Sequence, residues 1–189
     1  ISQVRLELQS LLDIQLDTWQ FAFNESELLV NDLPVGLSGT FAMPGDSLFF
    51  DLAFAAKASA FADYLTLVPP GYEHYLKDLK AEGNAELKGS FKGLYYEEEY
   101  PALDLNFRIS NGQVRYAGLP EEIRNINGTF SIVKPQGSFD LTALYLSGVH
   151  AEVRNNPLNL SLHLSDLFDN IRFDGSLTGK VNFDHLRDA

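Results

Sequence analysis

The segment Pro157-Leu158-Asn159-Leu160-Ser161-Leu162-His163-Leu164-Ser165 alternates leucine with polar residues at every step. In a β-strand, successive side chains point to opposite sides, so its four leucines would share one face and its polar residues the other. An amphipathic helix would instead repeat its apolar positions every three or four residues. The segment therefore predicts a strand with one apolar face and one face in water.

The same alternation precedes an Asn-Gly pair in the middle of the chain. The apolar positions before it are Leu103, Leu105, Phe107 and Ile109. Asn111-Gly112 is typical of a two-residue hairpin turn, because both central residues of a type I′ turn need a positive φ. Val114 and Tyr116 would then lie on the returning strand.

Two further strands are predicted on either side of a turn at residues 134–137. The first carries its alternating residues at Ile126, Gly128, Phe130 and Ile132. The second alternates at Phe139, Leu141, Ala143 and Tyr145, although Leu144 and Leu146 make it apolar on both faces. The turn at residues 43–46 takes the corresponding place in the first half of the chain.

Short strings recur at similar distances, with small slips between them, and indicate an internal duplication. Leu-Ser-Gly-Thr-Phe at 37–41 and Ile-Asn-Gly-Thr-Phe at 126–130 lie 89 residues apart, as do the Phe-Asp-Leu strings at 50–52 and 139–141. Leu33-Pro34 and Leu119-Pro120 match at 86 residues, and Leu87-x-Gly89 matches Leu177-x-Gly179 at 90. Alternation is common in β-rich chains and is the competing explanation. The expected repeats are 1–102, with a short helical insertion, and 103–189, continuous as one elongated domain.

Two short helices are expected within the first repeat. Phe61, Tyr64, Leu65 and Val68 have the spacing of one helical face, with Ser59 as the expected cap. After Pro69-Pro70, the residues Tyr72, Tyr75, Leu76 and Leu79 repeat that spacing in a second helix expected to end near Gly83. The predicted fold is thus mainly β: a long antiparallel meander, curled into a half-barrel or groove or folded as two packed sheets, with two short helices.

The amino-acid composition excludes or disfavours several classes of function. The formal net charge of −12 argues against binding of nucleic acid and against docking on anionic lipid headgroups. With no cysteine, disulfides, thiolate metal sites and cysteine catalysis are excluded. No stretch approaches the roughly 18 apolar residues of a membrane span. The start at Ile1, in strand-like sequence, suggests a fragment or a processed product.

The segment Asn111-Gly112-Gln113-Val114-Arg115-Tyr116, followed by Leu119-Pro120 and by Ile126-Asn127-Gly128-Thr129-Phe130, resembles the repeats of AsmA-like proteins of Gram-negative bacteria. The stretch 69–80 leading into Ala81–Gly89 is similar as well. The likeness covers about residues 20–183 and consists of small and apolar positions, with no catalytic signature.

This resemblance implies a fold, a place and a role. AsmA-like proteins, like the related TamB group, are anchored in the inner membrane and extend into the periplasm. Their antiparallel strands form a long groove with an apolar inner surface, and the family is implicated in outer-membrane biogenesis and phospholipid movement. The chain would then be a periplasmic piece, tethered by a segment outside it, with phospholipid or another acyl-chain lipid as its partner.

No catalytic or metal-binding constellation is predicted. His74, His150, His163 and His185 are scattered, without a second ligand at metal spacing. Glu97-Glu98-Glu99 between tyrosines fits a solvated loop better than a cation or sugar site. A glycosidase would need two carboxylates, and none of the 26 acidic residues is marked out by spacing. The chain is therefore expected not to be an enzyme and to hold no cofactor or metal.

Two functions stay open. The first is an apolar lipid groove, with candidate lining residues Phe107, Ile109, Phe130, Ile132, Leu158, Leu160, Leu162 and Leu164. Each of these taken alone is more often ordinary core. The second is a β-sandwich scaffold or protein-interaction module of the cell envelope. Its strand edges at 3–8 or 173–183 would pair with further repeats of the same protein or with envelope proteins.

Overall fold

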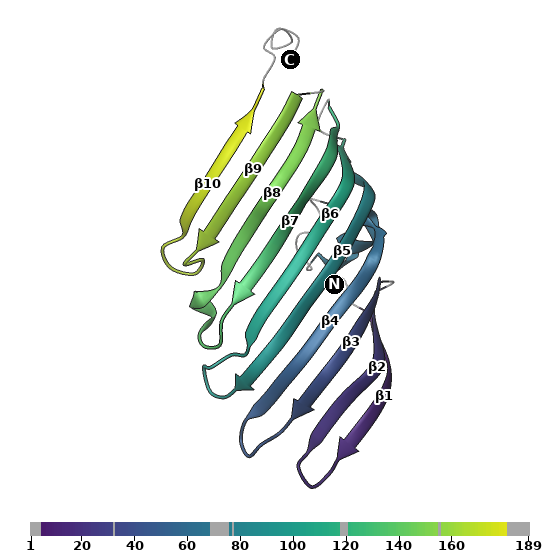
Figure 1. Cartoon of the computed structure of the whole chain (residues 1–189), viewed down its shortest axis with the longest axis vertical. Coiled ribbons are helices and arrows are strands. Elements are labelled where there is room, and N and C mark those ends of the chain that lie inside the picture. The colour runs from purple at the N-terminus through teal and green to yellow at the C-terminus, as the bar shows by residue number, and fades with distance from the viewer. Residues whose placement is uncertain are drawn as a thin grey trace.

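A computed structural model of the chain describes residues 5–31, 33–68, 76, 78–117, 121–154 and 156–180. Within them the chain forms one antiparallel sheet of ten strands in which each strand pairs with the next along the sequence (Figure 1). The elements are β1 (Leu6–Gln15), β2 (Gln20–Val30), β3 (Leu33–Ala42), β4 (Leu48–Ala60), α1 (Phe61–Tyr64), the 3-10 turn η1 (Leu65–Leu67), β5 (Leu79–Tyr95), β6 (Ala102–Tyr116), β7 (Ile123–Lys134), the 3-10 turn η2 (Phe139–Leu141), β8 (Ala143–Val153), β9 (Asn156–Ser165) and β10 (Arg172–Gly179). The predicted mainly β meander is confirmed.

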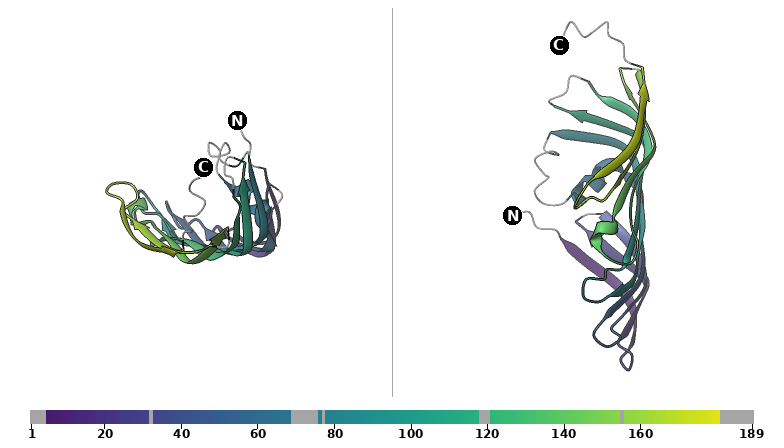
Figure 2. Two further views of the ribbon diagram at one scale, coloured as in Figure 1. Left: turned by 90° about the horizontal axis from the view of Figure 1, so that it is seen from above. Right: turned by 90° about the vertical axis from the view of Figure 1, so that its left-hand side faces the viewer.

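The sheet curls into an open trough and does not close into a barrel (Figure 2). The half-barrel form of the prediction is thus correct, and the form with two packed sheets is wrong. The helix α1 and the turn η1 lie on the concave side of the trough. A sheet of this kind satisfies its backbone groups through neighbouring strands while leaving one face free to contact something else.

The predicted hairpin at Asn111-Gly112 is wrong, because β6 runs straight through these residues. Asn111 has a φ of 51°, and the pairing of β6 shifts register there against both β5 and β7. The positive φ serves a β-bulge, which twists and bends the strand. Glu25 in β2, with a φ of 48°, marks a similar shift against β3.

The sequence Phe139-Asp140-Leu141 forms η2, and the strand predicted from Phe139 begins only at Ala143. The Ser138 hydroxyl accepts a hydrogen bond from the Asp140 amide at 3.3 Å, and this local cap favours a turn over a strand. The matching string Phe50-Asp51-Leu52 lies inside β4. The duplicated strings therefore share a structure at 37–41 and 126–130, in β3 and β7, and differ at the second pair.

The helix α1 is shorter than predicted, with η1 continuing it to Leu67. It begins after Ala60 without a side-chain cap, so the expected role of Ser59 is wrong. The second predicted helix lies mostly outside the described residues. Its expected end near Gly83 is wrong, because β5 already begins at Leu79.

The buried core lies between α1 and the middle of the sheet. Its members are Leu33, Val35, Ala56, Phe61, Tyr64, Ala85 and Leu87. The Tyr64 hydroxyl donates a hydrogen bond to the Lys57 carbonyl at 2.9 Å. Burial raises the pKa of that phenol, since it disfavours the charged form. The core thus fixes the helix over β3 to β6, and no described helix lies over the later strands.

Candidate functional site: the apolar concave face

Strand register places one apolar row across the whole trough. In an antiparallel ladder, directly paired residues point to the same face. The row takes one residue from each of the ten strands: Leu8, Leu28, Val35, Ala56, Leu87, Phe107, Phe130, Leu146, Leu162 and Gly175. Nine of these ten residues are apolar side chains larger than glycine, so the face is continuous.

All eight candidate residues from the sequence lie on this face. Phe107 pairs with Phe130, and Ile132 pairs with both Leu105 and Leu144. On β9, the four leucines pair with residues of the same face on both sides: Leu158 with Ala151 and Gly179, Leu160 with Val149 and Leu177, Leu162 with Leu146 and Gly175, and Leu164 with Leu144 and Phe173. The structure therefore brings the candidates together, although their role stays a prediction.

The helix divides these candidates into two groups. Phe107 and Ile109 pack against the core under α1, and the Phe107 ring lies 5.2 Å from the Tyr64 ring and 6.1 Å from the Phe61 ring, centroid to centroid. The other six lie on β7 and β9, where the described chain places no helix over them. All eight candidates are half-buried, so the two groups differ in what packs on them and not in their burial. We call the concave face of β7 to β10 the open half of the trough.

A small hollow marks the boundary between the covered and the open half. Its volume is about 120 Å³, and its walls are mainly apolar. They include Phe107, Ile109, Phe130, Leu146 and Val149. An apolar hollow stays free of ordered water, because water there would find too few polar partners.

The sequence reasoning missed two parts of this face. Leu144, Leu146 and Val149 of β8 complete the open half, but the shift between Leu146 and Val149 breaks their alternation. Gly148, with a φ of 58°, is the local signal of that bulge. The second missed part is an aromatic row over β2 to β5, in which the rings of Phe21, Phe41, Phe50 and Phe91 follow one another at 5.9, 5.2 and 5.0 Å.

The convex face of β8 to β10 is mainly polar. On β8 to β10, Tyr145, His163 and Asp174 occupy paired positions, and the Tyr145 and His163 rings stack at 4.5 Å. His150 contacts Asn159 Oδ1 through Nδ1 at 2.9 Å. His74 and His185 lie outside the described residues, and the described part of the chain holds no cluster of side chains suited to a metal ion.

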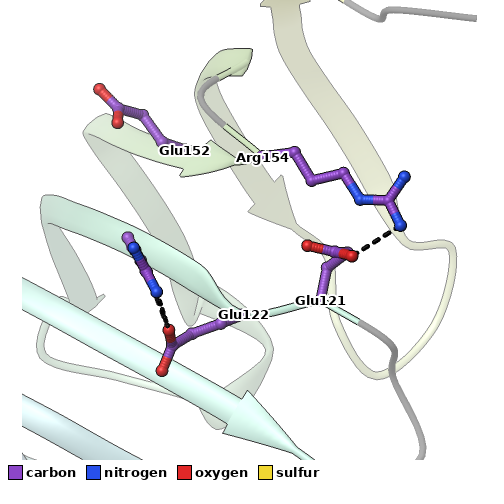
Figure 3. A pocket seen from close by; sticks show the side chains of 5 residues that line it. Glu121, Glu122, Glu152 and Arg154 are labelled. Atoms are coloured by element: carbon purple, nitrogen blue, oxygen red, sulfur yellow. Dashed lines mark hydrogen bonds and ion pairs between the residues drawn. The ribbon is translucent and has the colours of Figure 1, made fainter. Parts of the chain in front are cut away.

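A charged pocket lies where β7 begins and β8 ends (Figure 3). Arg154 Nη2 contacts Glu121 Oε1 at 2.6 Å, and Arg124 Nη2 contacts Glu122 Oε2 at 2.8 Å. The hydrogen bond from Arg124 lowers the pKa of Glu122, and a second bond from Gln113 acts the same way. Two of the three glutamates that line the pocket are thus paired with arginine, and the pocket is not part of the apolar face.

Lys134, the last residue of β7, is buried. Its side chain is 3% exposed, and its ammonium donates to the carbonyls of Tyr100, Pro135 and Gly137 at 3.1, 2.9 and 3.1 Å. Burial lowers its pKa, against the opposing effect of Glu99. The lysine thus links the connection between β7 and β8 to the connection between β5 and β6. Its ammonium group is bound by backbone carbonyls inside the fold.

Comparisons of the chain with models of protein families, with curated proteins and with solved structures found no match. Among the described residues, no helix has the length and apolar character needed to cross a membrane. The geometry of the trough is therefore the basis on which a function is proposed.

Proposed function

We propose that the open half of the trough binds the acyl chains of lipids. The observation that carries the proposal is the continuous apolar face of β7 to β10, which is half-buried on β7 to β9 and exposed on β10, while its convex counterpart is mainly polar. Soluble proteins rarely expose contiguous apolar surface of this kind without an occupant. An acyl chain has no polar group to satisfy and fits a face that is apolar over several strands.

The energetics favour such an occupant. Each methylene removed from water contributes about 0.8 kcal/mol, so a chain lying across a few strands gains several kcal/mol. The strand ladder already satisfies the backbone, so burying the face under lipid costs no backbone hydrogen bond. The lining residues are leucine, isoleucine and phenylalanine, which accept many chain lengths and degrees of unsaturation.

The resemblance to AsmA-like proteins supports a setting for this activity. In that setting the chain is a periplasmic part of a membrane-tethered envelope protein that handles phospholipid during outer-membrane biogenesis. The alternative is a non-enzymatic scaffold of the envelope. It is favoured by the two edge strands β1 and β10, whose outer sides no described strand pairs, and which would accept a further strand.

We expect purified chain to bind cis-parinaric acid, a fatty acid whose fluorescence rises in apolar surroundings. Leu160→Glu should weaken binding at least tenfold, because it puts a carboxylate on the apolar face, where an unpaired charge is costly. Ser161→Glu is the matched control, since Ser161 points to the convex face and bonds Ser176 Oγ at 2.9 Å.

Circular dichroism melting curves would verify that both variants are folded. Ser161→Glu should keep the affinity within about twofold. Equal binding by Leu160→Glu and Ser161→Glu, with both proteins folded, would contradict an acyl-chain site in the open half and would favour the scaffold.

A further inference from the structure

The five connections that lead from an odd-numbered to an even-numbered strand share one border of the sheet. They are the turns at residues 16–19, 43–47, 96–101, 135–142 and 166–171. Figure 1 shows them in sequence along the lower left border of the sheet. We call this border the acidic rim; it is distinct from the concave face that the proposed function uses.

Exposed apolar side chains gather on the acidic rim. Outside the edge strands β1 and β10, every large apolar side chain that is exposed in the described chain lies in these turns or in the last two residues of a strand leading into one. They are Leu16, Trp19, Met43, Leu94, Tyr95, Tyr96, Val133, Phe139, Leu141, Phe168 and Ile171. Such a concentration marks an interaction surface, because scattered exposure would not select one border.

The charged residues of these five turns are all aspartate or glutamate. These are Asp17, Asp46, Glu97, Glu98, Glu99, Asp140, Asp166 and Asp169. Asp166 pairs with Arg172, the first residue of β10, at 2.9 Å. Lys134, which directly precedes the turn at residues 135–142, is buried. The rim is therefore both apolar and strongly negative.

The opposite border differs in both respects. Its described turns expose no large apolar side chain. Among its described residues, Glu121 pairs with Arg154 and Glu122 pairs with Arg124. The described parts of the two borders thus present different chemistry.

We propose that the acidic rim docks a basic, amphipathic segment of a partner protein. Charge complementarity selects this occupant, since Lys or Arg beside apolar side chains would meet carboxylates beside Trp, Tyr, Phe and Leu. The carboxylates would repel the negative surface of a membrane that contains anionic lipid. Consecutive turns are two strands apart, at least about 9.5 Å, so a segment touching three turns must extend about 19 Å or more.

The chain contains a single tryptophan, Trp19, which lies on the rim and is 54% exposed. An 18-residue helical peptide of leucine and lysine, about 27 Å long, is a suitable probe of the surface. We expect its addition to shift Trp19 emission to the blue, and we expect the corresponding leucine–glutamate peptide to cause no shift. A second protein, Trp19→Phe with Phe139→Trp, moves the reporter along the rim and should respond in the same way.

Two triple variants with the same change in net charge test the site. Glu97→Gln with Glu98→Gln and Glu99→Gln should weaken peptide binding about tenfold, as expected for three exposed charge pairs. The control carries Glu27→Gln, Glu82→Gln and Glu86→Gln, away from the rim, and should change the affinity less than threefold.

Three results would overturn the proposal. One is equal weakening by the two triple variants, which would mean that only net charge matters. Another is a Trp19 shift with phosphatidylcholine vesicles and none with the peptide, which would make the rim a membrane surface. The third is a response confined to a tryptophan placed at Leu160 in the Trp19→Phe background, which would put the peptide in the trough. If the open half of the trough binds no acyl chain, the expected results of these peptide-binding experiments stay the same.

Discussion

Phe107→Ala should lower the free energy of unfolding by about 3 kcal/mol, as large-to-small changes under a packed cover do. The ring lies within 5.2 Å of the Tyr64 ring and packs against the core that fixes α1 on the sheet. Phe107 is half-buried, and its removal leaves a gap between α1 and the sheet. Urea denaturation followed by circular dichroism measures the loss.

Phe173→Ala is the matched control, with the same substitution on the same face. Phe173 lies on β10 and is 78% exposed, so its truncation should cost less than about 1 kcal/mol. The difference between the two variants measures how unevenly the concave face is covered. Similar losses for both would mean that the face is packed along its whole length and would argue against an open half.

Gly39→Ala should have an equally large effect for a different reason. Gly39 has a φ of 121°, a conformation that residues with a Cβ rarely adopt. An added Cβ would lie 2.0 Å from the Asp51 carbonyl oxygen, which is backbone of the paired strand β4 and cannot move aside. We expect a loss of about 3 kcal/mol or more, measured as a fall in the urea midpoint.

Gly36→Ala, on the same strand, is the control. It tests whether any glycine-to-alanine substitution in β3 lowers the stability. A Cβ at Gly36 would meet only the Ala55 carbonyl oxygen, at 3.5 Å, which is an ordinary contact. Its stability should stay within about 1 kcal/mol of the native protein. A Gly39→Ala protein as stable as Gly36→Ala would show that the close approach of β3 and β4 at this point does not exist.

The two repeated strings share a feature at their glycines. At Gly128, the counterpart of Gly39, an added Cβ would lie 2.8 Å from Val149 Cγ2, again on the next strand. Both strings therefore place glycine where two strands approach closely. The duplication into residues 1–102 and 103–189 stays a prediction.

The strands with strict alternation were predictable from the sequence because one periodic face is enough to define them. Residues 157–165 of β9 and the pattern from Leu103 to Ile109 in β6 are the clearest cases. Bulges were not predictable in the same way. Asn111-Gly112 has the residues of a hairpin turn, and only the pairing of β6 with both neighbours decides that it forms a bulge instead.

The candidate site was predictable as a face but not as a cavity. Alternation identified the leucines of β9 as one side of a strand, and pairing then joined them to β8 and β10. Which part of that side is covered depends on where α1 packs, and this is a tertiary contact between residues such as Tyr64 and Phe107 far apart in sequence. Curvature likewise arises from the whole sheet and has no local signal.

The most direct test of the acyl-chain site is photo-crosslinking in cells that carry the intact protein. A photoreactive amino acid would replace Leu160 in one protein and Ser161 in another, and attached lipid would be identified by mass spectrometry. We predict that lipid attaches at position 160 and not at position 161, because only the former faces the open half of the trough. Absence of lipid at both positions, with the protein folded and in place, would contradict the account and leave the leucines of β9 as structural residues.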